Sequence, residues 1–289
     1  MFAVYKKELR SSILGMTGPI FIAAVLVTVG IFTFVYQLSN AMVQFEYSVI
    51  SSSFWALLFT PILTMRSFTE ERKSKTDQLL FSLPISTADI VLGKFFAMAT
   101  VLAVPCVVMC VYPLVFSSYA SDGINFAVSY SAVLGFFLLG CCIIAISMLL
   151  SSFFESQVIC AIVNLILILV IYFMASLSSS IPEDAVFALA FLIVLSVAVA
   201  AIVYASTKNL IATAAAGVAL IGAAIAVYLI NSELYIGLAP TLISSLFIFQ
   251  PIYSIGNGIF DITCYVYYLS VAALFVFVTV QTVEHRRWN

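Results

Sequence analysis

Residues 129–150 read SYSAVLGFFLLGCCIIAISMLL and contain no charged side chain. A stretch of about 20 apolar residues is long enough to cross the hydrocarbon core of a bilayer, about 30 Å thick, as a helix. The rest of the chain has the same character, because 64% of its 289 residues are hydrophobic and only 8% are charged. Soluble domains contain roughly 45–50% apolar and about 25% charged residues. The sequence therefore predicts an integral membrane protein.

Further apolar stretches follow one another along the chain and predict about eight transmembrane helices. A helix satisfies its own backbone polar groups in lipid, and the alternating ten-residue pattern of a membrane β-barrel is absent from the sequence. We therefore predict an all-α fold with a single transmembrane domain over residues 1–289. The predicted spans are 17–38, 49–65, 95–117, 129–150, 158–177, 185–206, 211–230 and 265–283.

The positions of lysine and arginine predict the orientation, because basic residues are retained on the cytoplasmic side of a membrane. With the N-terminus in the cytoplasm, all eleven basic residues fall in predicted inner segments, and the C-terminus is cytoplasmic as well. Residues 1–16 place apolar side chains at three-to-four-residue spacing, with Lys6, Lys7 and Arg10 on other faces. This pattern predicts an interfacial helix along the inner surface of the membrane.

Residues 234–260 carry no charge and raise the alternative of a ninth crossing, which would place Arg286 and Arg287 outside the cell. Glycine and proline residues such as Pro240 and Pro251 interrupt the segment, and both residue types break helices or turn the chain. We predict a re-entrant hairpin in the outer leaflet, whose irregular backbone must be covered by protein or line a cavity.

Several kinds of chemistry are not expected on this chain. A net charge of −2 with an isoelectric point near 5.3 argues against nucleic acid as a partner. Gly93 and Lys94 do not form a phosphate-binding loop, because Ala88 and Phe95 occupy the places of its first glycine and its Ser or Thr. No H-E-x-x-H pattern occurs, and we predict no catalytic residue. We also predict no metal site, since the six cysteines are expected to pack as small apolar side chains.

Charged residues gather instead in residues 66–94, the only large segment predicted to face the cytoplasm. Within it, the stretch 76–83 reads TDQLLFSL and combines a polar start with an apolar cluster. Pro84 ends this piece, and a second helix is predicted to begin at Ser86, where Ser-Thr-Ala-Asp is typical of a capping box. The apolar cluster is predicted to dock on a soluble protein; the alternative is that it packs against its own helix bundle.

Residues 63–97, LTMRSFTEERKSKTDQLLFSLPISTADIVLGKFFA, resemble the loop between the first two span pairs of ABC-2 type permeases. Residues 151–163 are similar to the short inner loop of that family, and residues 245–288 to the end of its gliding-motility-type branch. Lys75 stands where the family often has glycine. Asp77 and Gln78 replace its usual Leu-Glu pair, and residues 185–230 look like an inserted helical hairpin. The matching loop positions are Glu70, Glu71, Lys73, Thr76, Leu79, Leu80, Ser82, Pro84, Ile85, Asp89, Ile90, Val91, Leu92, Gly93 and Lys94.

The resemblance implies a multi-pass permease subunit in the inner membrane of a bacterium, paired with a second copy or a homologue. Two separate ABC ATP-binding subunits would drive it, so ATP and magnesium would bind those chains and this one would need no cofactor. It would contact them through a coupling helix formed by Thr76, Asp77, Gln78, Leu79, Leu80, Phe81 and Leu83. The supporting loop would comprise Glu70, Glu71, Lys73, Pro84, Asp89 and Lys94, and the second inner contact Ser152, Glu155 and Gln157.

Three functions remain open at this stage. The first is export of an amphipathic or lipid-like molecule, a peptide, a drug or a polymer. The second is an ATP-driven mechanical transmitter that acts on an extracytoplasmic partner protein without moving a solute. The third is an ATP-independent carrier or channel, which is disfavoured because the middles of the predicted spans lack ionisable side chains.

Overall fold

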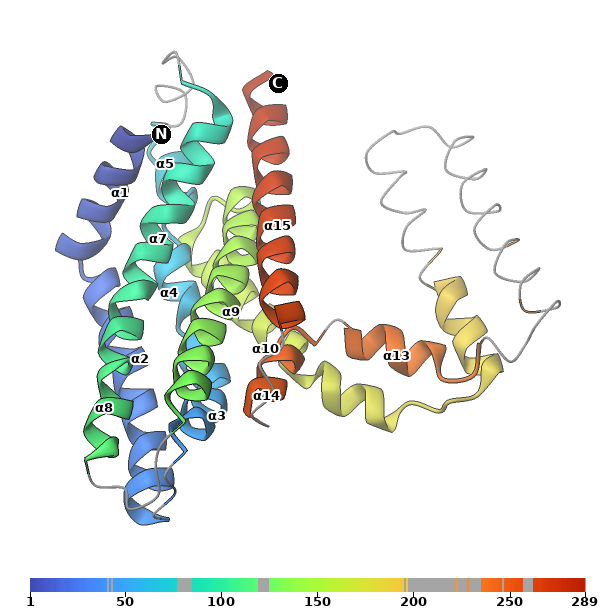
Figure 1. Ribbon diagram of the computed structural model, residues 1–289. Helices are drawn as coiled ribbons and strands as arrows, with labels where there is room; N and C mark the ends of the chain where they lie inside the picture. Colours follow the sequence, from blue (N-terminus) through green and yellow to red (C-terminus); the bar gives the residue numbers. More distant parts are fainter. Residues whose placement is uncertain are drawn as a thin grey trace. The chain divides into compact units, whose positions relative to one another are not determined.

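The computed structural model shows the protein as a set of helices (Figure 1). It describes residues 1–40, 42, 44–76, 85–118, 125–194, 196, 222, 228, 235–245, 247–256 and 262–288. Within these ranges every regular element is a helix, which confirms the predicted all-α fold. The elements are α1 (Phe2–Leu14), α2 (Thr17–Thr33), the π-helical η1 (Phe34–Ser39), α3 (Phe45–Leu57), α4 (Thr60–Thr64), α5 (Thr69–Lys73), α7 (Thr87–Met109), α8 (Val111–Ser117), α9 (Phe126–Phe153), α10 (Gln157–Ser180), α13 (Leu238–Ser245), α14 (Gln250–Gly256) and α15 (Ile262–Trp288).

Five helical stretches in the described residues are long and apolar enough to cross a membrane. They coincide with the predicted spans 17–38, 95–117, 129–150, 158–177 and 265–283, and the helices extend beyond several of the predicted ends. The five stretches are Thr17–Ser39, Thr87–Ser117, Phe126–Phe153, Gln157–Met174 and Ile262–Arg286. The protein is therefore a multi-pass membrane protein.

The predicted span 49–65 is not one continuous helix. The chain forms α3, breaks after Leu57, and resumes as the single turn of α4. Thr60 donates its hydroxyl to the carbonyl of Leu57 at 2.6 Å, and Pro61 stands in the first turn of α4. Proline has no N–H and is favoured at such a start. The predicted spans 185–206 and 211–230 lie mostly outside the described residues, so the total of eight stays a prediction.

The chain forms two compact units, Met1–Leu169 with Phe249–Asn289, and Val170–Ile248. In the first unit, α9 is the central helix and packs against α15, α7, α3, α14 and α4 (Figure 1). Glycines on α9 permit this close packing: a Cβ atom at Gly140 would lie 2.4 Å from a methyl group of Leu102, and one at Gly135 would lie 2.8 Å from a methyl group of Ile255. Most of α9 is buried inside the unit, and a buried helix is expected to be apolar all round, which fits the uncharged sequence of α9.

The second unit contains the later part of α10, a short apolar helix over Ala185–Val194, and α13. Ala188, Tyr235 and Ala239 form its small core. The predicted re-entrant segment 234–260 is not one continuous helix in its described part, because α13 and α14 are separate short helices. Within the first unit, α14 packs against α9 and α3. Entry of the segment into the outer leaflet stays a prediction.

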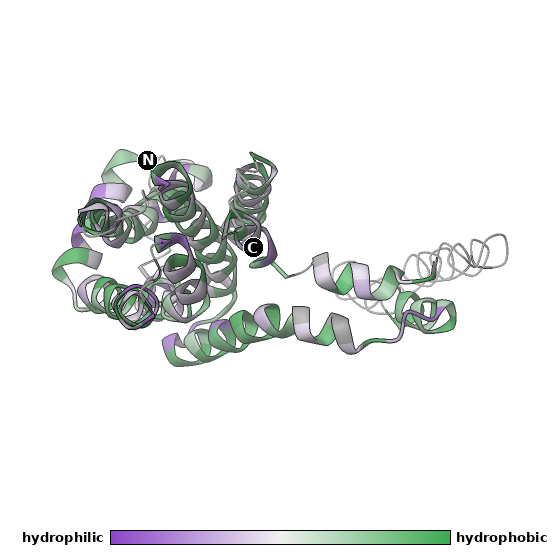
Figure 2. Ribbon diagram, turned by 60° about the horizontal axis from the view of Figure 1, so that its bottom comes forward, coloured by the Kyte–Doolittle hydropathy of each residue, from purple (hydrophilic) through white to green (hydrophobic). Residues whose placement is uncertain are grey.

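Large apolar side chains cover the outer faces of the long helices. Figure 2 shows hydrophobic residues along most of their length. On α15, for example, Val266, Leu269 and Phe277 are exposed, and on α10 the same is true of Val158 and Ile162. An apolar outer surface of this kind is suited to contact with lipid, because lipid tails replace the water that would otherwise meet these side chains.

Candidate functional site

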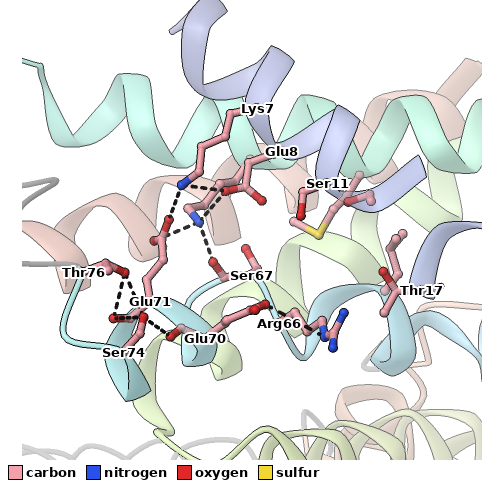
Figure 3. Close-up of a pocket in the computed structure, with 14 residues that line it drawn as sticks. Lys7, Glu8, Ser11, Thr17, Arg66, Ser67, Glu70, Glu71, Ser74 and Thr76 are labelled. Carbon is pink, nitrogen blue, oxygen red and sulfur yellow. Dashed lines mark hydrogen bonds and ion pairs between the residues drawn. The ribbon is translucent and has the colours of Figure 1, made fainter. Parts of the chain in front are cut away.

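A buried lysine on α7 forms the centre of a charged cluster. The cluster lies at the end of the first unit where Figure 1 marks the chain termini, and Figure 3 shows Lys7, Glu8 and Glu71 of this cluster in close-up. Lys94 is only 1% exposed. Its Nζ lies 2.9 Å from Glu71 Oε2 and donates to Glu8 Oε1 at 3.1 Å and to the carbonyl of Ser67 at 2.5 Å. The ammonium group carries three protons, so each has an acceptor within reach. A buried charge is tolerated when it is paired and hydrogen-bonded in this way.

Two further side chains, Phe68 and Lys7, contact the Lys94 cluster. The ring of Phe68 lies 5.0 Å from the Lys94 ammonium, measured to the ring centroid, which is a cation–π distance. Lys7 lies 3.4 Å from Glu71 and 4.0 Å from Glu8. The two glutamates therefore share two lysines, and their negative charges are neutralised inside the cluster.

The glycine before Lys94 explains how α1 reaches this position. A Cβ atom at Gly93 would lie 3.1 Å from the carbonyl of Met1 and 3.2 Å from the nitrogen of Tyr5. A side chain there would push α1 away, so Gly93 allows the backbones of α1 and α7 to touch. About two turns further along α7, Tyr5 and Thr100 share a hydroxyl hydrogen bond of 3.1 Å. The Gly-Lys pair in the sequence thus serves helix packing and charge pairing.

The predicted start of a helix at Ser86 is confirmed. Ser86 Oγ accepts from the backbone nitrogen of Asp89 at 3.1 Å and donates to Asp89 Oδ2 at 2.7 Å. The capping side chain ends the loop at a defined residue. The helix that begins here is not short, however, because α7 runs without interruption from Thr87 to Met109. The end of the loop and the next membrane-spanning helix are therefore one element.

The other end of the loop is tied to the end of α9 and to the segment between α9 and α10. Arg72 Nη1 donates to the carbonyl of Ser152 at 3.1 Å, and Arg72 Nη2 lies 3.4 Å from Glu155 Oε1. The backbone nitrogen of Phe68 donates to Ser151 Oγ at 3.2 Å. Two of the three residues predicted for the second inner contact thus lie next to α5. The third, Gln157, is the first residue of α10.

The structure brings together only part of the predicted contact surface. Glu71 and Lys94 are in the cluster, and Glu70 lies 3.9 Å from Arg66 near the surface. Lys73 is exposed on α5, and Thr76 is exposed just beyond it. The predicted coupling-helix residues Asp77, Gln78, Leu79, Leu80, Phe81 and Leu83, together with Pro84, lie outside the described residues. The coupling helix itself therefore stays a prediction.

Lys75 adopts a left-handed backbone conformation with φ of 56°. Residues with a Cβ atom rarely take this conformation, whereas glycine takes it at no steric cost. Lys75 occupies the place where the resembling loops often have glycine. The turn that follows α5 thus has the backbone for which a glycine is suited, although this chain uses a lysine.

The residues of the site that were not predicted include Glu8, Lys7, Ser67, Phe68 and Arg72. A signal existed for Glu8, because it is the only acidic residue among the first 16 positions, in a helix that otherwise carries basic residues. No comparable signal marks Ser67, which contributes a backbone carbonyl.

Comparison with known proteins gives one family. A family model described as ABC-2 family transporter protein matches residues 3–230. A search of curated proteins and a search of solved structures each find no match. The matched range includes α1, the loop 66–94 and the segment between α9 and α10.

Proposed function

Because this chain belongs to the ABC-2 family of transporter proteins, we propose that it is the permease subunit of an ATP-driven exporter. A separate ATP-binding chain supplies the energy, and the loop 66–94 receives it. The permease works as a pair, with a second copy of itself or with a homologue. The contact with the ATPase is the predicted coupling helix, formed by Thr76, Asp77, Gln78, Leu79, Leu80, Phe81 and Leu83.

One observation supports this proposal above the others: the loop is anchored to the helix bundle at both of its ends. On the α5 side, Glu71 binds Lys94, and Arg72 binds the last turn of α9 and Glu155 just after it. On the other side, Ser86 caps α7, which continues directly into the bundle. A conformational change is passed on only through contacts that differ between two states of the bundle. Because both ends of the loop are bonded to the bundle, a displacement of the loop moves the membrane-spanning helices with it.

The experiment is an ATPase assay on the reconstituted complex of this chain with its ATP-binding subunit. We expect Asp77→Lys together with Gln78→Lys to abolish most of the stimulation that the permease gives to the ATPase, while the complex still inserts into liposomes. Glu183→Gln, a charge change on the predicted outer side, serves as the control and leaves the stimulation intact. Full ATPase stimulation by the double variant at Asp77 and Gln78 would refute the proposed contact.

The resemblance of residues 245–288 to the gliding-motility-type branch favours a second mode of action, in which the complex pulls on an extracytoplasmic protein. A flux assay separates the two modes. If liposomes that contain only the permease and its ATPase accumulate an amphipathic solute when ATP is added outside, the exporter is supported. ATP-dependent change in a bound extracytoplasmic protein, without flux, supports the mechanical mode.

A further inference from the structure

A cavity of about 260 Å³ lies beside the Lys94 cluster, between α1, the start of α2, the turn before α5, and α7 (Figure 3). A single water needs only about 10–15 Å³ of such space. Pockets for small ligands usually measure about 300–1,000 Å³ and are mostly apolar. This cavity is slightly smaller and its walls are mainly polar or charged. It is therefore suited to a small hydrophilic group.

Ser67 gives the first indication of a ligand. The residue is 7% exposed and lines the cavity, and its carbonyl accepts from Lys94. Its hydroxyl oxygen is buried and has no hydrogen-bond partner in the described part of the chain. Buried polar groups are nearly always hydrogen-bonded. A ligand group in the cavity would supply the missing partner.

The cavity offers further unused donors. Arg66 has only a long contact to Glu70, between Nε and Oε2 at 3.9 Å, so its two terminal amino groups have no partner among the described residues. The hydroxyls of Ser11, Ser12 and Thr17 also line the cavity, and they make no hydrogen bond within the described ranges. A guanidinium group surrounded by hydroxyls is suited to a phosphate, because both supply N–H or O–H donors to its oxygens.

The cavity also carries acceptors. Glu8 uses Oε1 for Lys94, and its Oε2 makes no hydrogen bond within the described ranges. Glu70 also lines the cavity and has only the long contact to Arg66. Three basic residues and three glutamates line the walls: Lys7, Arg66, Lys94, Glu8, Glu70 and Glu71. Their formal charges cancel, so the cavity is matched to a ligand that carries both signs and no net charge.

We propose that this cavity binds the phosphoethanolamine headgroup of a membrane phospholipid. The phosphate accepts from Arg66 and Ser67, and the primary ammonium donates to Glu8 and Glu70. The lipid source follows from the position, because Thr17 is both a wall residue and the first residue of a membrane-spanning stretch. Beyond it, α2 exposes apolar side chains such as Ile20, Val27 and Ile31, along which acyl chains can lie. The site does not depend on the proposed coupling to an ATPase.

Native mass spectrometry of the purified full chain, released from nanodiscs of equal parts phosphatidylethanolamine, phosphatidylcholine and phosphatidylglycerol, tests the proposal. We expect one phosphatidylethanolamine to be retained per chain, in at least about tenfold excess over either other lipid. Phosphatidylcholine has the same phosphate but no N–H donors, and phosphatidylglycerol adds a net negative charge. Arg66→Gln should lower retention about tenfold, because a charge-assisted hydrogen bond to phosphate is lost. Arg10→Gln is the matched control, since Arg10 does not line this cavity, and it should retain the lipid.

Ser67→Ala separates a ligand role from a merely unsatisfied hydroxyl. With a bound headgroup, the alanine variant loses retention severalfold while its thermal stability in lipid-free detergent stays unchanged or rises. Equal retention by this variant and the parent would overturn the proposal, as would equal retention of all three lipids or of none. A preference for phosphatidylglycerol would show an anion site instead. Binding of soluble phosphoethanolamine without retained lipid would refute the lipid source.

Discussion

On its α5 side the loop 66–94 is held to the bundle by two groups of contacts, the Lys94 anchor and the Arg72 anchor, and they differ in how far they are removed from water. The Lys94 anchor is buried, with the lysine 1% exposed and both glutamates largely covered. The Arg72 anchor lies at the surface, where the side chain of Glu155 is 77% exposed. Exposed ion pairs contribute only about 0–1 kcal/mol, whereas removal of one partner from a buried pair costs about 3–5 kcal/mol. The Lys94 anchor therefore contributes more to the free energy of unfolding than the Arg72 anchor. The Arg72 anchor costs less to break and can re-form more easily.

The largest effect is expected at the buried anchor. Lys94→Gln leaves Glu8 and Glu71 facing each other with only Lys7 nearby, and the cost is about 3–5 kcal/mol. Thermal unfolding in detergent measures the loss. The triple variant Glu8→Gln, Glu71→Gln, Lys94→Met removes all three charges and should recover most of it, because neutral groups of similar size need no counter-ion. An unchanged melting temperature for Lys94→Gln would contradict the buried cluster.

The next effect concerns the helix contact that brings Glu8 to Lys94. Gly93→Val forces a branched side chain against the backbone of α1, and overpacking of this kind costs about 1–3 kcal/mol. Disulfide trapping between cysteines introduced on α1 and α7 should slow as the helices separate. Gly30→Val is the matched control, because a Cβ atom there meets no other atom within 4 Å. Equal trapping rates in both variants would place α1 elsewhere.

A smaller effect is expected at the exposed anchor. The double-mutant cycle of Arg72→Gln and Glu155→Gln should give a coupling energy of about 0.2–1 kcal/mol. High salt should weaken it further, because exposed charges are screened. Chemical unfolding of the four variants at low and high salt gives both values. A coupling of several kcal/mol that does not change with salt would make the two anchors alike.

The smallest effect is expected at the turn after α5. The left-handed backbone conformation costs a residue with a Cβ atom about 1–2 kcal/mol, and Lys75→Gly removes this cost. Glycine is more flexible in the unfolded chain, however, and this offsets about 0.5–1 kcal/mol of the gain. We expect a net gain of less than about 1 kcal/mol. Lys73→Gly, at the end of helix α5, should destabilise instead. Thermal unfolding of both variants in the same detergent measures the two stability changes, which should have opposite signs.

Predictions from the sequence succeeded where neighbours along the chain decide the structure. The long spans follow from apolar runs, and the start of α7 follows from the Ser86 cap, whose partner is three residues away. The span 49–65 was wrong as a single helix, because Pro61 and Thr60 favour a new start in the middle of an apolar run. The site was predicted in part: Glu71, Lys94, Ser152 and Glu155 were expected near the inner surface, but Glu8 and Arg72, which bind them, were not predicted as site residues.

By itself the sequence determined that this protein is helical, lies in a membrane and concentrates its charges in one loop, because hydropathy and helix caps act over a few residues. The tertiary structure alone decided which charges meet. Lys94 binds Glu8 from 86 residues away, and Arg72 binds Glu155 from 83 residues away. Such pairs depend on which helix faces pack together, and small residues such as Gly93 set that packing by allowing two backbones to touch.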